Sequence, residues 1–288
     1  MRPFLIAALT LLLITACGPR WYYHHLDWMI PWYVDDYLAL DSGQRNDLER
    51  RLAIQLNWHC RTQLTEYATF LKSVSRDFQT PDKNVTREQF VSYLQSLNQY
   101  WKDLMAQIGP DVADIVITAS DDQIDELFRN IEKDNLERQR IYVDPPEHEI
   151  LQNRTDRMVE RLERWIGTLT DTQYDAVQQW SRSMGATTDQ WLANRRRTQQ
   201  AFRKLITTRR IDSAFKEKFT ALLVSPEVVR TKTYQAQLDR NIALVLDLLT
   251  EIEKTLTDTQ RFHLLAYLES LAEDFDRLAC EIPPKDLQ

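Results

Sequence analysis

Turn-forming residues are scarce in this chain, whose 288 residues include five glycines and ten prolines. Glycine and proline interrupt helices and supply the tight turns that connect short strands. Their scarcity argues against a strand-rich sandwich or barrel and favours long helices. Five glycines also leave few positions where backbone can close around a phosphate group, and the sequence contains neither a P-loop nor a dinucleotide-binding fingerprint.

Signatures of catalysis and of metal binding are also missing from the sequence. It has no GxSxG nucleophile elbow and no HExxH motif, and its five histidines and three cysteines lack the paired spacing of a zinc site. We therefore predict no metal site and no cofactor, and no feature points to an enzyme. The net charge of −7 and the isoelectric point near 5.4 argue against nucleic acid as a partner, because nucleic-acid binding needs a basic surface.

Long apolar runs are absent except at the N-terminus. Met1-Arg2-Pro3 carries one positive charge and precedes an apolar run over residues 4–14. This run is shorter than the ~20 residues that a membrane-spanning helix needs and is typical of a secretory signal. It ends in Ile14-Thr15-Ala16-Cys17, which resembles the bacterial lipobox, where the cysteine thiol receives a diacylglyceryl group and becomes the new N-terminus. The alternative is an ordinary signal peptide cut elsewhere, with Cys17 an unmodified thiol.

The lipobox resemblance implies that residues 1–16 are a lipoprotein signal peptide and that Cys17 carries the lipid. One acyl chain gives only marginal membrane binding, whereas two or more anchor a protein stably. Gly18 follows the cysteine where sorting rules for such lipoproteins use Asp to retain a protein in the inner membrane. By that resemblance we expect the chain on the outer membrane, facing the periplasm, with membrane lipid as its first partner.

Two cysteines remain if Cys17 is lipidated. Disulfides persist in oxidising compartments such as the periplasm, so Cys60 and Cys280 are candidates for a bridge between the first long helix and the last. The alternative is two separate buried thiols. Sequence alone does not show whether their Cα atoms come within bridging distance.

Apolar residues recur at helical spacing nearly throughout, as in the stripe Phe90, Leu94, Leu97, Trp101, Leu104 and Ile108 and in the stripe Leu238, Ile242, Val245, Leu249, Ile252 and Leu256. Such stripes are the core faces of packed helices. We predict an all-α fold with a helix content above about 65%, twice the usual share. The expected architecture is a multi-helix bundle of about ten antiparallel helices, over residues 43–59, 62–78, 87–108, 121–141, 147–167, 171–183, 188–209, 212–223, 227–254 and 258–280.

Helix starts are marked by a recurring pattern, a Ser, Thr or Asp followed three residues later by Gln. In such a capping box the first side chain accepts from a free backbone N–H, and the Gln side chain accepts from the N–H of the capping residue. The pattern occurs at Asp41/Gln44, Thr86/Gln89, Ser120/Gln123, Thr170/Gln173, Thr187/Gln190 and Thr257/Gln260. Ser225-Pro226-Glu227 predicts a further helix start, with proline at the first position.

The domain organisation follows from these patterns. Residues 17–40 form a lipid anchor and an aromatic N-terminal segment, residues 41–282 a helical domain, and residues 283–288 a tail. Pro145-Pro146 separates two stretches of similar length, residues 41–144 and 147–282. These are either halves of a degenerate duplication or unrelated stretches that share capping chemistry.

The aromatic segment has two interpretations. Tryptophan and tyrosine favour the membrane–water interface, so the segment could rest on the lipid surface beside the anchor. Alternatively it packs onto the helical domain, since a loose tether would be rich in Gly and Ser. Its candidate membrane or packing residues are Trp21, Tyr22, Tyr23, Trp28, Trp32 and Tyr33.

A basic face is expected on the helix over residues 188–209, in an otherwise acidic protein. Arginine forks recognise phosphate and carboxylate bidentately, which makes this face a candidate anion-binding site for lipid head groups. The alternative is a solvated face paired with nearby acidic helices, for instance at Asp121 or Asp125. The residues concerned are Arg195, Arg196, Arg197, Arg203 and Lys204.

Two family resemblances arise from the motifs. The stronger is carried by the run from Leu26 to Tyr37, Trp58-His59, Tyr142-Val143-Asp144-Pro145, Glu163-Arg164-Trp165 and Trp191-Leu192. The chain resembles proteobacterial lipoproteins known only as a domain of unknown function, which implies an envelope location and a helical fold but no activity. The second is the Leu-Thr-x-x-Gln box at residues 169–173 and 256–260, which resembles the box of Spy/CpxP-type periplasmic proteins. Those are helical, cradle-shaped and chaperone-like.

Three functions follow as hypotheses. The first is a non-enzymatic interaction or binding module at the periplasmic face of the outer membrane, with another envelope protein or an anionic lipid as partner. The second, from the weaker resemblance, is a chaperone-like holdase. The third is a cell-wall or lipid-modifying enzyme with an unfamiliar site.

Overall fold

The computed structural model describes residues 19–79, 84–184 and 187–280. The signal peptide, the lipidation candidate Cys17 and the tail over residues 283–288 lie outside the described residues. Within them, 85% of the residues are helical and no strand occurs. The predictions of an all-α fold and of a helix content above about 65% are therefore confirmed.

Eleven α-helices and one short 3-10 helix make up the described part of the chain. They are, in chain order, α2 Pro19–His24, α3 Leu26–Asp35, α4 Ser42–Gln79, α5 Arg87–Thr118, α6 Asp121–Tyr142, α7 Glu147–Ile166, α8 Asp171–Ser183, α9 Thr188–Ile206, α10 Phe215–Val224, η1 Pro226–Val229, α11 Lys232–Lys254 and α12 Asp258–Leu278. Helices α2 and α3, in the aromatic segment, are not among the ten that the sequence predicts. Within the described ranges no helix is both long enough and apolar enough to cross a bilayer.

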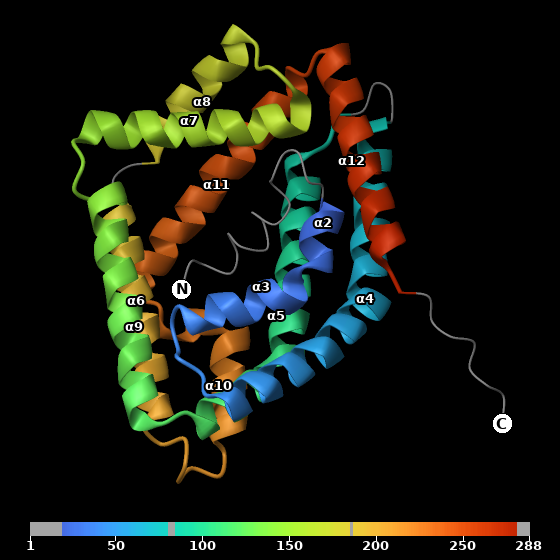
Figure 1. The fold of residues 1–288 in the computed structure, drawn as a ribbon. Coiled ribbons are helices and arrows are strands. Elements are labelled where there is room, and N and C mark those ends of the chain that lie inside the picture. The colour runs from blue at the N-terminus through green and yellow to red at the C-terminus, as the bar shows by residue number, and fades with distance from the viewer. Residues whose placement is uncertain (1–18, 80–83, 185–186, 281–288) are drawn as a thin grey trace, which may run out of the picture.

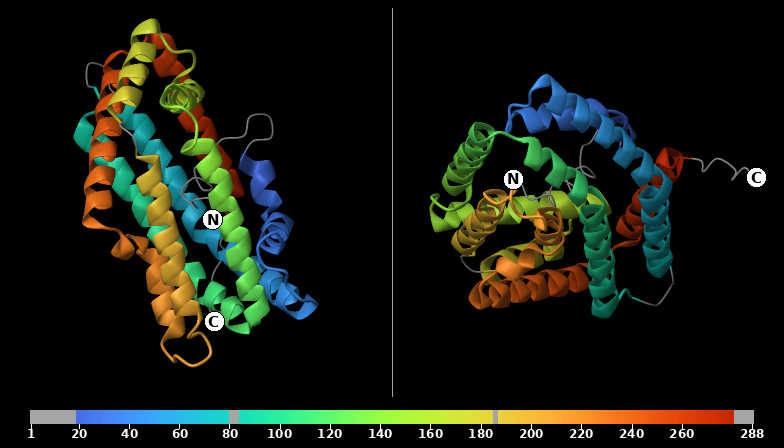
Figure 2. Two further views of the ribbon diagram at one scale, coloured as in Figure 1. Left: turned by 90° about the vertical axis from the view of Figure 1, so that its left-hand side faces the viewer. Right: turned by 90° about the horizontal axis from the view of Figure 1, so that it is seen from below.

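The helices pack in pairs around an open frame (Figure 1). Helix α12 lies along α4, α10 along the second part of α5, and α9 along α6. Helices α7 and α8 close one end of the frame, and α11 crosses it diagonally from that end (Figure 1). Seen from below, the pairs form a ring, with α2 and α3 against its α4 side (Figure 2).

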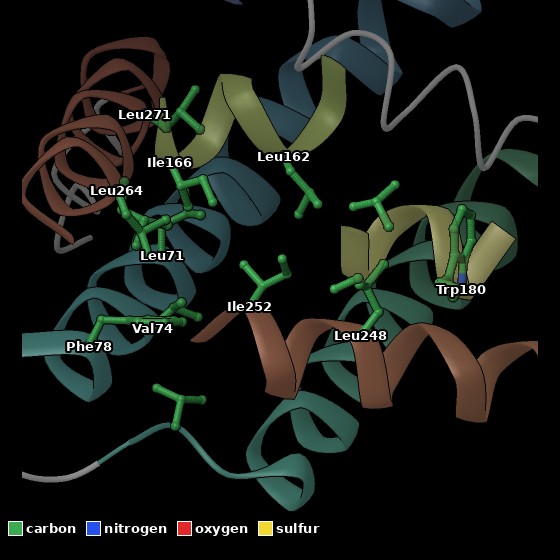
Figure 3. Packing of buried hydrophobic residues seen from close by; sticks show 14 of the residues in the cluster. Leu71, Val74, Phe78, Leu162, Ile166, Trp180, Leu248, Ile252, Leu264 and Leu271 are labelled. Carbon is green, nitrogen blue, oxygen red and sulfur yellow. The ribbon is translucent and has the colours of Figure 1, made fainter. Parts of the chain in front are cut away.

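The core is divided among the junctions of this frame. The largest apolar cluster joins α4, α7, α8, α11 and α12; Leu71 and Leu264 lie side by side in it, and Leu162 and Ile252 point into the space between their helices (Figure 3). A second cluster joins α5, α6, α9 and α10, and a third lies around Cys60 and Leu278. Each cluster combines residues from both stretches, 41–144 and 147–282. Neither stretch therefore has a core of its own.

Several helix boundaries differ from the predicted ones. Residues 43–59 and 62–78 are one helix, α4, because no glycine or proline interrupts residues 44–79. Helix α5 runs ten residues past its predicted end and contains Pro110. A Cβ on Gly109 would lie 2.7 Å from Cγ2 of Thr220, so the glycine allows α10 to approach α5 closely.

Two predicted core stripes are only partly buried. Leu94 and Leu97 of α5 are 41% and 40% exposed, and Ile242 of α11 is 40% exposed. The frame is more open than the compact bundle that periodicity alone implies, so part of each stripe lacks a covering helix.

Five of the six predicted capping boxes form, with both the side-chain and the reciprocal Gln hydrogen bonds present. Thr187 does not cap α9. Its backbone is in the helical region rather than extended, and its hydroxyl accepts from Asn241 at 3.4 Å. The start predicted at Ser225 is the four-residue η1, and α11 begins later, capped by Thr231.

Four of the capping boxes meet in reciprocal pairs, which the sequence does not indicate. Gln173 Nε2 donates to Gln260 Oε1 at 2.9 Å, and Gln260 Nε2 donates back to Gln173 Oε1 at 2.7 Å. Each Nε2 also donates to the backbone carbonyl two residues before the other box, Thr255 at 3.1 Å and Thr168 at 2.8 Å. The pair therefore joins the start of α8 to the start of α12.

The same arrangement recurs between α4 and α6. Gln44 and Gln123 exchange side-chain hydrogen bonds at 3.2 and 2.8 Å, and they donate to the carbonyls of Thr118 and Ala39 at 3.2 and 2.6 Å. Each of the stretches 41–144 and 147–282 thus contains one such pair. Capping alone does not require boxes to pair.

Candidate functional site

The aromatic segment has one face against the helical domain. Tyr23 of α2 donates to the carbonyl oxygen of Leu56 at 3.3 Å, and its hydroxyl lies 3.2 Å from Nδ1 of His59, both on α4. Pro31 of α3 is buried, and Asp35 forms an ion pair with Arg45 of α4. This face is packed as the second interpretation of the segment expects.

The aromatic segment also exposes three tryptophans. Trp21, Trp28 and Trp32 are 42%, 53% and 63% exposed. The ring of His25 stacks on Trp21 with centroids 4.3 Å apart and meets Trp28 edge-on at 6.2 Å. Trp28 and Trp32 are four residues apart on α3 and so lie on one side of that helix. We call Trp21, Trp28 and Trp32 the tryptophan face.

A disulfide lies beneath the start of this segment. Cys60 and Cys280 are bonded, with Cα atoms 5.2 Å apart, and the N–H of Cys280 donates to the carbonyl of Cys60 at 3.1 Å. Tyr23 packs against the same cluster. The bond therefore ties the end of α12 to α4 at the place where the aromatic segment docks.

Burial perturbs the titrating groups under the segment. It raises the pKa of Tyr23 to about 12 and lowers the pKa of His59 to about 4. In both cases burial removes the water that would solvate the charged form of the side chain, and so favours the neutral form. At neutral pH both side chains are uncharged. Their contact is therefore a hydrogen bond between neutral groups, with a packing role rather than a catalytic one.

The basic face of α9 is largely paired with α6. Arg195 is bound by Asp134 at 2.6 Å and Asn135 at 2.7 Å, and burial lowers its pKa. Arg196 and Arg203 pair with Glu132 and Asp125, each at 3.0 Å. Carboxylates of α6 therefore neutralise most of this face, as its alternative interpretation expects.

Arg197 and Lys204 complete the predicted group. Arg197 and Lys204 are exposed, and neither has an ion pair within the described residues. The structure thus leaves two of the five predicted basic residues without an ion pair among the described residues. Arg197 also lines a shallow open cavity of about 430 Å³, together with Arg196 and Asp189.

A second group of arginines, on α7, was not predicted from the sequence. Arg157, Arg161 and Arg164 lie on one face of that helix, and no carboxylate of the described residues pairs with them. Their spacing of four and three residues was readable as one helical face. The signal was missed because acidic residues alternate with them in the sequence and give the segment no net basic character.

The second cavity and the acidic, histidine and cysteine side chains show no metal site within the described ranges. The second cavity, about 390 Å³, is lined by Thr65, Glu66, Thr69, Tyr100 and neighbouring residues of α4 and α5, and no cysteine or histidine lines it. No group of three or more His, Cys, Asp or Glu side chains there has a geometry suited to a metal ion.

Comparison with known proteins gives a family but no activity. No curated protein and no solved structure matches the chain. A family model described as a family of unknown function, DUF6279, matches residues 36–235. The match covers more than half of the chain and includes α4 to α10. The chain therefore belongs to the DUF6279 family of proteins of unknown function.

Proposed function

We propose that the protein is a lipid-anchored, non-enzymatic interaction module at the periplasmic face of the outer membrane, and that the tryptophan face rests on the lipid surface beside the anchor. The tryptophan face carries the proposal, since it is an exposed aromatic surface directly after the lipidation candidate. Tryptophan prefers the interface because its ring is apolar and its N–H needs a polar partner.

The distance from the anchor supports this placement. Trp21 is four residues after Cys17, and four residues span at most about 14 Å. The headgroup layer of one leaflet is about 5–8 Å thick, half the difference between the total and hydrocarbon thicknesses. A lipid on Cys17 therefore keeps Trp21, on α2, within reach of the interface, and Trp28 and Trp32 follow on the next helix, α3.

The contacts of the aromatic segment with α4 give this membrane contact a consequence. Tyr23, Pro31 and Asp35 fix the segment to α4, so a membrane-bound tryptophan face sets the orientation of the whole domain. A flexible tether would leave that orientation free. The proposed module therefore presents the rest of its helical frame to the periplasm in one fixed orientation. A partner-binding protein needs such an orientation so that the same surface always faces its partner.

The holdase and enzyme hypotheses receive less support. In the Leu-Thr-x-x-Gln boxes, Gln173 and Gln260 are 1% and 5% exposed and are hydrogen-bonded to each other. They stabilise helix starts, so the boxes offer no exposed surface for client binding. No catalytic constellation supports an enzyme.

The test has two stages. Metabolic labelling with a fatty acid analogue should label the wild-type protein, and Cys17→Ala should abolish the label. Labelled protein is then placed in bilayers that contain lipids brominated near the headgroup, which quench nearby tryptophan fluorescence. We expect quenching that is largely lost in the triple variant Trp21→Phe, Trp28→Phe and Trp32→Phe.

A control separates this face from the other five tryptophans of the chain. The variant Trp165→Phe/Trp191→Phe changes two partly buried rings elsewhere and should leave quenching intact. If Cys17→Ala loses the label but the triple and double tryptophan variants are quenched equally, the anchor stands and the membrane contact of the tryptophan face is refuted. A label that survives Cys17→Ala would refute the anchor itself.

A further inference from the structure

Helix α7 carries a row of arginines along one side. Arg157, Arg161 and Arg164 are four and three residues apart, so they share a face and span about 10 Å along the helix axis. Arg154 continues the row by one turn and donates to the carbonyl of Ser181 at 2.8 Å. We call Arg157, Arg161 and Arg164 the α7 arginine row.

Several other arginines that lie between helices have carboxylate partners. Arg51 contacts Asp111 and Asp114, Arg195 contacts Asp134, and Arg261 contacts Glu253. By contrast, the described residues supply no ion pair to any member of the α7 arginine row. The acidic residues of α7 form no ion pair with the row: Glu163 accepts from the backbone N–H of Leu169 at 3.5 Å, and Glu160, which lies three residues after Arg157 and four before Arg164, is in no ion pair of the described residues.

The environment of the row favours a negatively charged ligand. Nη1 of Arg164 is buried with no hydrogen-bond acceptor among the described residues. Arg157 lies over the ring of Tyr142, 5.3 Å from its centroid, which orients the guanidinium without neutralising it. The Arg161 side chain is exposed, but protein atoms around it partly desolvate its guanidinium and lower its pKa, and the positive charges of Arg157 and Arg164 lower it further, against smaller opposing effects of Tyr142 and Glu160.

A guanidinium does not lose its proton in proteins. The charge of the row therefore persists despite its partial desolvation, and buried donors without acceptors destabilise the structure. An anion bound across the row would supply both the missing charge and the missing acceptors. Arg161 is exposed and the other two are partly exposed, so a ligand can reach all three.

We propose that the α7 arginine row binds a phosphate-bearing ligand, with the guanidinium groups of Arg157, Arg161 and Arg164 contacting phosphate oxygens. The planar fork of arginine matches phosphate bidentately, and three forks over about 10 Å suit two phosphate groups or a diphosphate. A lipid headgroup and a soluble phosphate compound present the same chemistry. The proposal is independent of the lipid anchor and of the tryptophan face.

The test uses the full chain purified in detergent and two probes. Inorganic pyrophosphate represents a soluble phosphate compound, and dihexanoyl phosphatidic acid, a short-chain lipid with a phosphate monoester, represents a headgroup. Dihexanoyl phosphatidylcholine serves as the reference lipid. Calorimetric titration should give binding of at least one phosphate probe that weakens with added salt, as screened charge pairs do.

The variant Arg157→Gln/Arg161→Gln/Arg164→Gln should lower that affinity at least tenfold. Arg196→Gln/Arg203→Gln removes two paired arginines of α9 and should change it by less than twofold. Helical circular dichroism and melting temperature check that both variants fold. If the triple variant does not fold, the single variant Arg161→Gln, at the most exposed member, replaces it and should lower the affinity several-fold.

Each outcome decides the proposal. Row-dependent binding of pyrophosphate supports a soluble phosphate ligand, and row-dependent binding of phosphatidic acid alone supports a lipid headgroup. The proposal is overturned if neither phosphate probe binds, if phosphatidylcholine binds equally well, or if the α9 variant loses as much affinity as the α7 variant.

Discussion

The paired capping boxes predict an unusually large effect for one polar substitution, Gln260→Ala. The Gln260 side chain takes part in four hydrogen bonds, with Thr257 N at 3.1 Å, Gln173 Nε2 at 2.9 Å, Thr168 O at 2.8 Å and Gln173 Oε1 at 2.7 Å. It is 5% exposed and Gln173 is 1% exposed, so water does not replace the lost partners.

The magnitude follows from these bonds. Each is worth about 1 kcal/mol net, and a buried group left without a partner adds a further penalty. Gln173 keeps its bonds to Thr170 N and Thr255 O, which limits the loss. We expect Gln260→Ala to lower the free energy of unfolding by about 3–4 kcal/mol, or the melting temperature by roughly 10 °C for a domain of this size.

The matched control is Gln89→Ala in the unpaired box of α5. Gln89 occupies the same position in its box, but its side chain accepts only from Thr86 N, at 2.9 Å and in an exposed setting. We expect a cost of about 1 kcal/mol or less. Gln123→Ala, in the partly buried pair, should fall between the two.

Urea denaturation followed by circular dichroism gives the three values, and a double-mutant cycle of Gln173→Ala and Gln260→Ala should return a coupling of about 1–2 kcal/mol. The reasoning fails if Gln260→Ala costs no more than Gln89→Ala, or if the cycle shows no coupling. Either result would mean that the boxes act only as local caps.

Three further predictions follow. The disulfide closes a loop with a sequence separation of 220 residues, so the variant Cys60→Ala/Cys280→Ala should lose roughly 5 kcal/mol of stability by the chain-entropy model; labelling of both native thiols without a reductant would contradict the bridge. In the folded protein the pKa of His59 is lowered to about 4, so below pH ~6.5 the unfolded state binds more protons than the folded state. The free energy of unfolding should therefore fall as the pH drops from there to about 4. If it falls as steeply with pH in His59→Phe, His59 is not the cause. Gly109→Ala should destabilise by about 1–3 kcal/mol through contact with Thr220, although Gly→Ala normally stabilises a helix, and Thr220→Ala in the same chain should restore stability.

Local signals account for what was predicted well. A capping box is complete within four residues, and its hydrogen bonds do not depend on distant parts of the chain, so five of the six formed as expected. Thr187 does not cap α9: its backbone is in the helical region, and its hydroxyl accepts from a distant side chain, that of Asn241. Pro110 shows the same limit, since the helix end expected at Ile108 was overridden by the packing of α5 against α10.

The candidate sites divide in the same way. The sequence identified the aromatic segment and the basic run, but it assigned neither a face nor a partner to their side chains. Arg195 pairs with Asp134 across 61 positions of the chain, and Gln173 with Gln260 across 87. Those partners depend on how α6 meets α9 and how α8 meets α12, and periodicity within one helix carries no information about either contact.

The sequence by itself determined the helical class, most helix starts and the lipobox-like N-terminus, because these depend on residues within a few positions of one another. Only the tertiary structure decided which arginines are neutralised, which tryptophans stay exposed and which capping boxes meet. Each of these is set by the distance between side chains on different helices, and that distance exists only once the helices have packed.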